Sequence, residues 1–321
     1  MHYDIFNGDA DGICALHLLR LAEPMPEAEL VTGVKRDIAL LDRLQHRAGP
    51  KDTLTVLDIS MDVNKAALKN LLERGCQVFY ADHHYAGDLT NGPGLIAHLD
   101  PDPEICTSLI IDRLQDGRFR PWAIVAAFGD NLHAAARKAA DTLNLDEAQY
   151  AMLRELGELI NSNGYGETVA DLHFLPSTLY LALRPYTDPF EFFRHSPALA
   201  TLRSGFAADM TLALTHAPSQ EGPGGRLYLF PAQPWSRRVA GVFSNEKARE
   251  RPDLAHALVV DSGSGNFMVS VRAPILSKRG ADTLCRAFPT GGGRAAAAGI
   301  NSLPESLLDE FMKQFFAIFV G

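Results

Sequence analysis

This 321-residue chain has few cysteines, no excess of basic residues and no long apolar run. Its four cysteines, Cys14, Cys76, Cys106 and Cys285, show no CxxC spacing and no clustering with histidine. Such a pattern predicts free, mostly buried thiols in a reducing compartment. It argues against disulfides and against a structural zinc site.

The formal net charge is −9, so the chain lacks the broad basic field that a long nucleic-acid groove requires. An anionic substrate is therefore expected to be small, or to be held through a metal. No segment approaches the roughly 18 uninterrupted apolar residues that span a bilayer, so no membrane partner is expected. Asp4, Asp9 and Asp11 interrupt any secretory-signal profile, and we expect a cytoplasmic protein.

The hydrophobic fraction of 46% and the charged fraction of 21% are typical of a globular protein, and the length allows two domains. The first part of the chain alternates strand-like and helix-like patterns, which predicts βαβ units and a parallel sheet. We expect strands at residues 3–6, 30–34, 54–59 and 77–81, and helices at 13–22, 38–47 and 65–74. A helix-rich connector, residues 137–200, and a smaller α+β domain follow, which gives predicted domains at 1–195 and 204–321.

Acidic side chains follow three of the four predicted strands. The first strand runs into Asp9 and Asp11, the third into Asp58, and the fourth into the Asp82-His83-His84 triplet. Parallel strand ends share one edge of a sheet, so these carboxylates would repel one another unless a cation compensates them. A divalent metal with an imidazole ligand resolves that conflict. Taken singly, each motif also fits an ordinary turn, cap or packing role.

Two further features lie later in the chain. Asp130 ends an apolar helix at 122–128, where an aspartate is most often a cap. A glycine run, Gly291, Gly292 and Gly293, precedes Arg294 and four alanines, which we interpret as an anion-binding turn before a helix. A final amphipathic helix is expected at 305–319. Other candidates for binding substrate anions, with solvated surface as the alternative, are Arg272, Arg237, Arg238, Lys35 and Arg36.

The succession NGDADG, VLDIS, ADHH, FGD and GGGRAAAAG resembles the DHH phosphoesterase superfamily, in the DHH/DHHA1 branch that includes nanoRNase, oligoribonuclease and cyclic-dinucleotide phosphodiesterase-like proteins. The resemblance covers nearly the whole chain. It implies an α/β fold with a parallel-sheet DHH domain, a helical connector, a smaller α+β DHHA1 domain and an active site in the cleft between the domains.

The resemblance also implies ligands for manganese. Asp58 would bridge two ions, Asp9 would hold the first, and Asp11, His83 and Asp130 would hold the second. Asp82 would be either another ligand or an acceptor that orients His83. The implied catalytic residues are Asp9, Asp11, Asp58, His83 and His84. The implied substrate contacts are His84, Arg272, Gly291, Gly292, Gly293, Arg294 and Asn7.

Two positions depart from the usual pattern of this family. Ile5 stands four residues before Asp9, where many members have histidine, and it cannot bind a metal. The first ion would then be weaker, or completed by Asn7, water or substrate, so one or two Mn²⁺ ions are expected, with Mg²⁺ or Co²⁺ as alternatives. Arg294 replaces the histidine of the usual GGGH, which supplies a fixed cation suited to phosphate or a guanine edge.

These features predict a metal-dependent phosphodiesterase that hydrolyses short nucleotide substrates to mononucleotides by metal-activated water. Linear or cyclic dinucleotides, such as pGpG or pApA, and very short oligonucleotides fit the acidic charge. One alternative is a non-catalytic nucleotide-binding protein of the same fold. Another is a phosphatase that acts on a small phosphate compound such as 3'-phosphoadenosine 5'-phosphate. The sequence leaves open whether the protein is a monomer or a homodimer.

Overall fold

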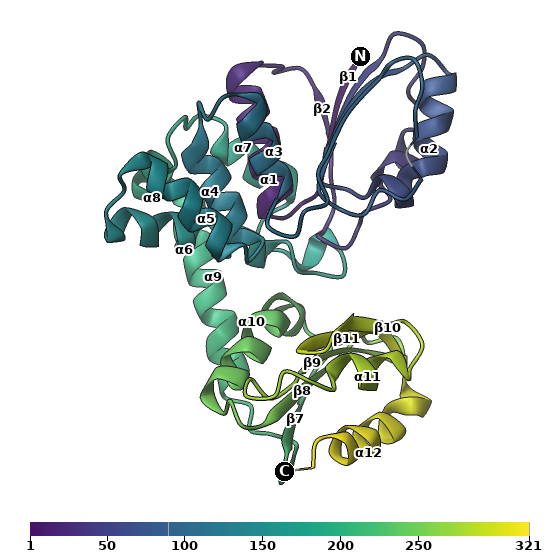
Figure 1. Ribbon diagram of the computed structural model, residues 1–321, viewed down its shortest axis with the longest axis vertical. Coiled ribbons are helices and arrows are strands. Elements are labelled where there is room, and N and C mark those ends of the chain that lie inside the picture. Colours follow the sequence, from purple (N-terminus) through teal and green to yellow (C-terminus); the bar gives the residue numbers. More distant parts are fainter. Residues whose placement is uncertain (89, 321) are drawn as a thin grey trace. The chain divides into compact units, whose positions relative to one another are not determined.

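The computed structural model describes residues 1–88 and 90–320 of the chain, which divides into two compact units, Met1–Ser204 and Gly205–Gly321. Each unit contains one sheet (Figure 1). The division falls inside α9 (Pro197–Leu214), a continuous helix.

The first unit contains a five-stranded sheet of order β2-β1-β3-β4-β5 in which every pair is parallel. The strands are β1 (His2–Phe6), β2 (Glu29–Val31), β3 (Thr53–Leu57), β4 (Gln77–Asp82) and β5 (Leu95–Leu99). The helices are α1 (Ala10–Ala22), α2 (Met61–Glu73), α3 (Thr107–Leu114), α4 (Arg120–Gly129), α5 (His133–Ala140), α6 (Glu147–Asn163), α7 (Pro176–Leu183) and α8 (Pro189–His195). The predicted α/β class with a parallel first sheet is confirmed.

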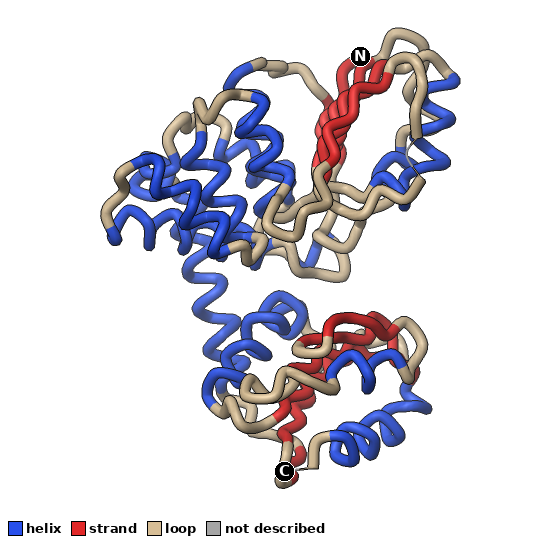
Figure 2. The backbone as a smooth tube through the Cα atoms, viewed as in Figure 1, coloured by secondary structure: helices blue, strands red, loops and turns tan. Residues whose placement is uncertain are grey.

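Helices cover both faces of this sheet. Figure 2 shows α2 on one side of the strands and the larger helical group on the other. On the α2 side, Ile5 and Val56 from the strands pack against Leu68 and Leu71 of α2, and all four are buried. Alternate strand residues face α1 and its neighbours, so both faces are apolar, as expected for a parallel sheet.

One predicted helix of this unit is wrong. Residues 38–47 form a single 3₁₀ turn, Leu40–Arg43, followed by further turns. The Asn64 side chain accepts a hydrogen bond from the Leu41 amide (3.1 Å) and donates one to the Ile38 carbonyl (2.7 Å). Because a side chain on α2 satisfies these backbone groups, the segment can bury its leucines without forming a regular helix.

The second unit contains a mixed six-stranded sheet of order β10-β11-β9-β8-β7-β6, in which only the β7–β8 pair is parallel among the strands described. The strands are β6 (Gln220–Gly222), β7 (Gly225–Phe230), β8 (Ala255–Asp261), β9 (Asn266–Arg272), β10 (Gly291–Arg294) and β11 (Ala297–Pro304). The helices are α10 (Pro234–Glu250), α11 (Ala281–Arg286) and α12 (Leu308–Ile318).

The two faces of this second sheet have different covers. Phe243 of α10 packs with Tyr228 and Leu258 on one face. Phe311 and Phe315 of α12 pack with the side chains of the opposite face, together with α11. The second sheet therefore has its own core on each side.

The helix predicted from residue 295 is wrong. Gly291–Arg294 and Ala297–Pro304 instead form the antiparallel hairpin β10–β11, and β11 also pairs with β9. Alanine favours helices, but pairing with β9 and burial of Ile300 and Leu303 outweigh that preference. The glycine run is thus a strand and not a helix N-terminus.

Candidate metal centre and substrate-binding strand

Three polar residues lie at the carboxyl edge of the first sheet because the registers of β1, β3 and β4 are in line. Phe6 pairs with Leu57, and Leu57 pairs with Ala81, so the residues that follow each of them are neighbours. These following residues are Asn7, Asp58 and Asp82.

Asp58 occupies an unusual backbone position at this edge. Its φ of 61° lies in the left-handed region, and its amide donates to the Ala81 carbonyl at 3.1 Å. Aspartate tolerates this conformation better than most residues, yet such backbone strain is found mainly at functional sites. Leaving the strand in this way holds the buried Asp58 side chain against the other acids.

The two acids of the first motif lie at the start of α1. Asp9 is the N-cap, and its Oδ1 accepts a hydrogen bond from the Gly12 amide at 3.1 Å. Asp11 lies in the first turn, because α1 begins three residues earlier than the predicted helix at 13–22. A side chain at Gly12 would collide with the Asn7 backbone, so this glycine permits the tight strand-to-helix turn.

The Asp11 carboxylate is held by the N-terminus of a second helix, α3. It accepts hydrogen bonds from the backbone amides of Thr107 (2.7 Å) and Ser108 (2.8 Å). The Thr107 hydroxyl also donates to Asp58 Oδ1 at 3.1 Å. Free amides at a helix start stabilise negative charge, so α3 fixes the orientation of Asp11.

His83 brings the separate acids together. Its Nε2 lies 3.3 Å from Asp130 Oδ2, 3.5 Å from Asp58 Oδ1 and 4.0 Å from Asp11 Oδ2. Asp130 reaches this point from the C-cap of α4. Acids predicted from three distant segments therefore converge on one imidazole.

The arrangement of these donor atoms fits a divalent ion. Ligand atoms of Asp11, His83 and Asp130 lie within 4.8 Å of one another, and so do those of Asp58, His83 and His84. Carboxylate oxygens combined with imidazole nitrogen suit Mn²⁺ and related first-row ions. The ligand roles of these residues remain predictions, which the geometry supports.

Asp82 binds the other histidine of the triplet. Its Oδ1 accepts a hydrogen bond from His84 Nδ1 at 2.7 Å, so Asp82 orients His84 and not His83. The expectation that Asp82 orients His83 is therefore wrong. Its Oδ2 is buried and has no hydrogen-bond partner among the described residues, which leaves the predicted ligand role open. His84 is the more accessible histidine, with a side chain 43% exposed.

Lys35, which follows β2, is a major feature of the site whose contact with the acids the sequence did not predict. Its ammonium forms an ion pair with Asp9 Oδ2 and lies 3.4 Å from Asp130 Oδ1 and 3.2 Å from Asn161 Oδ1. The sequence offered Lys35 as a contact for substrate anions. Its place after a strand at the same sheet edge as the acids was the signal that could have assigned it to the cluster.

Mutual repulsion and burial perturb the carboxyl groups of this cluster. Burial, reinforced by the charges of Asp11, Asp9 and Asp130, raises the pKa of Asp58 well above its ordinary value. Burial opposes ionisation of Asp9 as well, but the neighbouring Lys35 ammonium lowers the pKa of Asp9 below its ordinary value. The protein thus holds one acid ionised and resists ionisation of another.

Ile5 and Asn7, which the family resemblance brought into question as metal or substrate contacts, have different surroundings. Ile5 is completely buried in the core on the α2 side of the sheet. Asn7, predicted to contact substrate, is 3% exposed and donates from Nδ2 to the Lys35 carbonyl at 3.1 Å. Its Oδ1 is buried with no hydrogen-bond partner among the described residues. Asn7 therefore positions the Lys35 backbone.

In the second unit, the sheet register aligns the two predicted arginines. Arg294 of β10 pairs with Ala297 of β11, which in turn pairs with Arg272 of β9. Directly paired residues point to the same face of a sheet, so the arginines flank the small Ala297 side chain. Arg272 Nε donates to Asn245 Oδ1 of α10 at 2.7 Å, which places both arginines on the α10 face.

The three glycines of β10 are not equivalent. A side chain at Gly291 would collide with the Cys285 carbonyl, and Gly293 has a φ of 133° and lies against Ala298. Gly292 has open space where a side chain would be, and it pairs with Gly299. Local packing explains two of the glycines, whereas an added side chain at Gly292 would meet no neighbouring atom.

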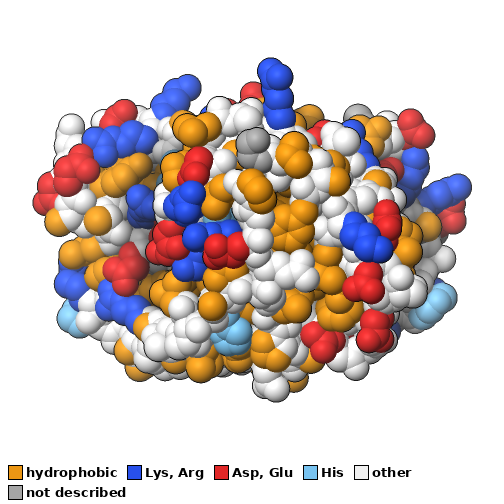
Figure 3. Space-filling view, turned by 90° about the horizontal axis from the view of Figure 1, so that it is seen from below, with side chains coloured by type: hydrophobic (Ala, Val, Ile, Leu, Met, Phe, Trp, Pro, Cys, Tyr) orange, Lys and Arg blue, Asp and Glu red, His pale blue; other side chains and the backbone are white. Residues whose placement is uncertain are grey.

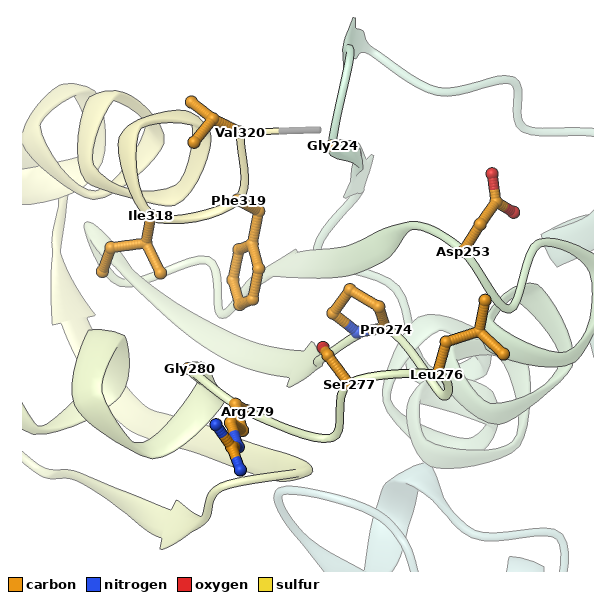
Figure 4. A pocket seen from close by; sticks show the side chains of 10 residues that line it. All are labelled: Gly224, Asp253, Pro274, Leu276, Ser277, Arg279, Gly280, Ile318, Phe319 and Val320. Atoms are coloured by element: carbon orange, nitrogen blue, oxygen red, sulfur yellow. The ribbon is translucent and has the colours of Figure 1, made fainter.

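A cavity of about 470 Å³ lies elsewhere in the second unit (Figure 4). The side chains of Pro274, Leu276, Ile318 and Phe319 contribute to its lining, together with Arg279. None of the residues predicted to bind metal or substrate lines this cavity. Its lining mixes apolar groups with the charged side chains of Arg279 and Asp253 and lacks a cluster of metal ligands.

The sequence matches no family model and no curated protein, but its fold matches solved structures. A DHH-domain structure described as a member of a family of ribosomal proteins is 14% identical, with a TM-score of 0.62, and the match covers 98% of this chain and 85% of that one. Exonuclease RecJ bound to manganese is 16% identical, with a TM-score of 0.59 and coverage of 98% and 89%. The chain therefore has the fold of DHH-domain proteins, as predicted.

A further match is the pGpG-specific phosphodiesterase PggH from Vibrio cholerae. It is 14% identical, with a TM-score of 0.50, and the match covers 98% of this chain and 99% of that chain. At these identities the likeness concerns the fold.

Two further findings concern the charge of the surface and the presence of membrane-spanning helices. Acidic and basic side chains are interspersed on the face of the protein drawn in Figure 3. In the part of the chain that the structure describes, no helix combines the length and apolar character needed to cross a bilayer.

Proposed function

We propose that this chain is a metal-dependent phosphodiesterase that hydrolyses short nucleotide substrates, such as linear or cyclic dinucleotides, to mononucleotides. The observation that carries the proposal is the convergence of His83 Nε2 on Asp11, Asp58 and Asp130 at the carboxyl edge of a parallel sheet. Among structures of the same fold are an exonuclease bound to manganese and a pGpG-specific phosphodiesterase, which is consistent with this chemistry.

In this proposal Asp11, Asp58, His83 and Asp130 hold Mn²⁺, with Mg²⁺ or Co²⁺ as alternatives, and Asp82 Oδ2 is available to join them. When bound, a divalent ion supplies Lewis acidity, which activates water and neutralises charge on a phosphoryl group.

The chain's own residues orient these groups. The amides of Thr107 and Ser108 hold the Asp11 carboxylate in one orientation. Asp82 fixes the ring of His84, so that its other nitrogen is left for a phosphate oxygen. Burial disfavours a protonated His84, but the Asp82 carboxylate raises the pKa of His84 above its ordinary value. His84 is thereby suited to bind and donate a proton to negatively charged oxygen.

The second unit supplies substrate contacts in this proposal, which retains the predicted domains 1–195 and 204–321. Arg272 and Arg294 flank Ala297 on one sheet face, and Gly292 leaves backbone open on the same strand pair. Guanidinium groups separated by a small residue suit a phosphate or a base edge. The net charge of −9 favours a short substrate over a long nucleic acid.

The test is a substrate panel with Mn²⁺: pGpG, pApA, their cyclic counterparts, a longer oligonucleotide and 3'-phosphoadenosine 5'-phosphate. We expect mononucleotides from the dinucleotides, little cleavage of the longer strand, and loss of activity in Asp58→Asn. Dinucleotide binding without product would instead indicate a non-catalytic nucleotide-binding protein. Inorganic phosphate from the bisphosphate alone would indicate a phosphatase.

A further inference from the structure

Lys35 is bound inside the acidic cluster by several independent contacts. Its ammonium contacts Asp9, Asp130 and Asn161, and it lies 5.7 Å from the centre of the Tyr165 ring. Three oxygens and a π face around one side chain make a complete binding site for an ammonium ion.

The backbone holds Lys35 in this place. Its amide donates to the Gly164 carbonyl at 2.9 Å, and its carbonyl accepts from Asn7 Nδ2 at 3.1 Å. Both neighbours belong to segments that also form the site, since Asn7 follows β1 and Gly164 is the C-cap of α6. The Lys35 backbone is therefore fixed by segments that form the site, and its partly exposed side chain extends from that fixed point to the acids.

Asp9 differs from Asp11 and Asp58 because a lysine of the chain, Lys35, forms an ion pair with one of its oxygens. Oδ1 accepts from the Gly12 amide, and Oδ2 binds the Lys35 ammonium. Among the described residues, the groups with ligand atoms close enough for an ion contain Asp11, Asp58 and Asp130, but none contains Asp9. Ile5, four residues before Asp9, is an apolar side chain buried in the core on the α2 side of the sheet, and it supplies no ligand atom.

From this arrangement we propose that Lys35 takes the place of a second cation in the acidic cluster, so that each chain binds one divalent ion. The Lys35 ammonium compensates Asp9 and one oxygen of Asp130, and the divalent ion is held by Asp11, Asp58, His83 and the other oxygen of Asp130. The inference rests on the proposed metal-dependent function and defines its metal centre as mononuclear.

The test measures Mn²⁺ stoichiometry by equilibrium dialysis with metal analysis, and the state of the bound ion by electron paramagnetic resonance. Wild type is expected to bind one equivalent with the spectrum of an isolated ion. Lys35→Ala is expected to bind a second equivalent, which gives an exchange-coupled spectrum, because Asp9 and Asp130 lose their internal cation. The matched control is Lys65→Ala, which removes a surface lysine that lies 3.4 Å from Asp88 and should leave one equivalent.

Asp9→Asn separates the roles of the two cations. If Asp9 binds Lys35, this variant keeps one equivalent, whereas Asp58→Asn lowers Mn²⁺ affinity by about 100-fold or more. Lys35→Met combined with Asp9→Asn removes both charges, and it is expected to fold and bind one equivalent even if Lys35→Ala does not fold.

Three outcomes would overturn the inference. These are two coupled ions in wild type, a single equivalent in folded Lys35→Ala, and loss of the ion in Asp9→Asn. Absence of any bound ion in wild type would refute the proposed metal-dependent function itself, and with it the inference. The two failures are thus distinguished by the wild-type stoichiometry alone.

Discussion

The acidic cluster of the first unit and the arginine-bearing strands of the second unit differ in how their polar groups are held. Asp11, Asp58 and Asp82 are buried, and protein groups determine their orientations. Arg294 is exposed beside the small side chain of Ala297. Chemistry on a phosphoryl group needs fixed, desolvated charges, whereas recognition of a substrate needs accessible ones. Substitutions in the two regions should therefore have different kinetic consequences.

The largest effect is expected for Asp58→Asn. Loss of this carboxylate should lower kcat by roughly 10³-fold or more, because it removes a shared ligand from the centre of the cluster. Steady-state kinetics with saturating Mn²⁺ provides the measurement. The matched control is Asp112→Asn, a buried carboxylate that pairs with Arg120 and should leave kcat within about threefold. Equal losses in both variants would contradict a special role for Asp58.

A smaller effect of a different kind is expected for Arg294→Ala. Loss of one exposed guanidinium contact should raise KM by about tenfold and change kcat little, since such a contact contributes roughly 1–2 kcal/mol. Arg249→Ala on α10, which removes an exposed arginine paired with Glu246, serves as control. A fall in kcat with unchanged KM would place Arg294 in the chemical step and remove the contrast between the two regions.

Two glycines of β10 are expected to differ in whether they serve the stability of the fold or the binding of nucleotide. Gly291→Ala should destabilise the fold by about 1–3 kcal/mol, because the new methyl group would collide with the Cys285 carbonyl. Gly292→Ala should alter the free energy of unfolding by about 0.5 kcal/mol or less but weaken nucleotide binding. Chemical denaturation and ligand titration on both variants measure this. Equal destabilisation would show that Gly292 is also a packing glycine.

The smallest expected effect concerns pH. The pKa of Asp58 in the folded chain lies well above its ordinary value of 3.8. Between these two pKa values, the folded chain without a metal ion keeps a proton on Asp58 that the unfolded chain has lost. The fold therefore loses stability as pH rises from the lower pKa value to the higher one. Mn²⁺ competes with this proton, so the increase in Tm on adding Mn²⁺ should be larger at about pH 8 than at about pH 5. Thermal denaturation at both values tests this. Asp58→Asn should reduce the difference.

Much of the first unit could be predicted because its strands end in residues whose chemistry is easily recognised. The motifs around Asp9, Asp58 and His83 indicated a shared sheet edge, and the registers place their segments side by side. Asp130 was recognised only through family resemblance, since a helix-ending aspartate is ordinarily a cap. The sequence offered Lys35 only as a candidate contact for substrate anions, because a lysine after a strand carries no sign of whether it also meets a carboxylate.

The second unit was harder to predict where secondary structure depends on pairing. Four alanines after the glycine run favour a helix locally, but β11 gains hydrogen bonds from both β9 and β10. Likewise, residues 38–47 of the first unit have helical periodicity, but Asn64 on α2 satisfies their backbone groups. Both errors arise because a distant segment supplies hydrogen bonds that local sequence cannot indicate.

The sequence by itself determined the fold class, the free buried cysteines and the set of acids and histidines that converge at one sheet edge. The succession of strands and helices follows from the apolar patterns, and the type of chemistry follows from the kinds of side chain present. Only the tertiary structure decided that Asp82 binds His84, that α3 amides bind Asp11 and that Lys35 binds Asp9. These pairings depend on distances between side chains and backbone groups that only the folded chain fixes, which is the physical reason that no local pattern contains them.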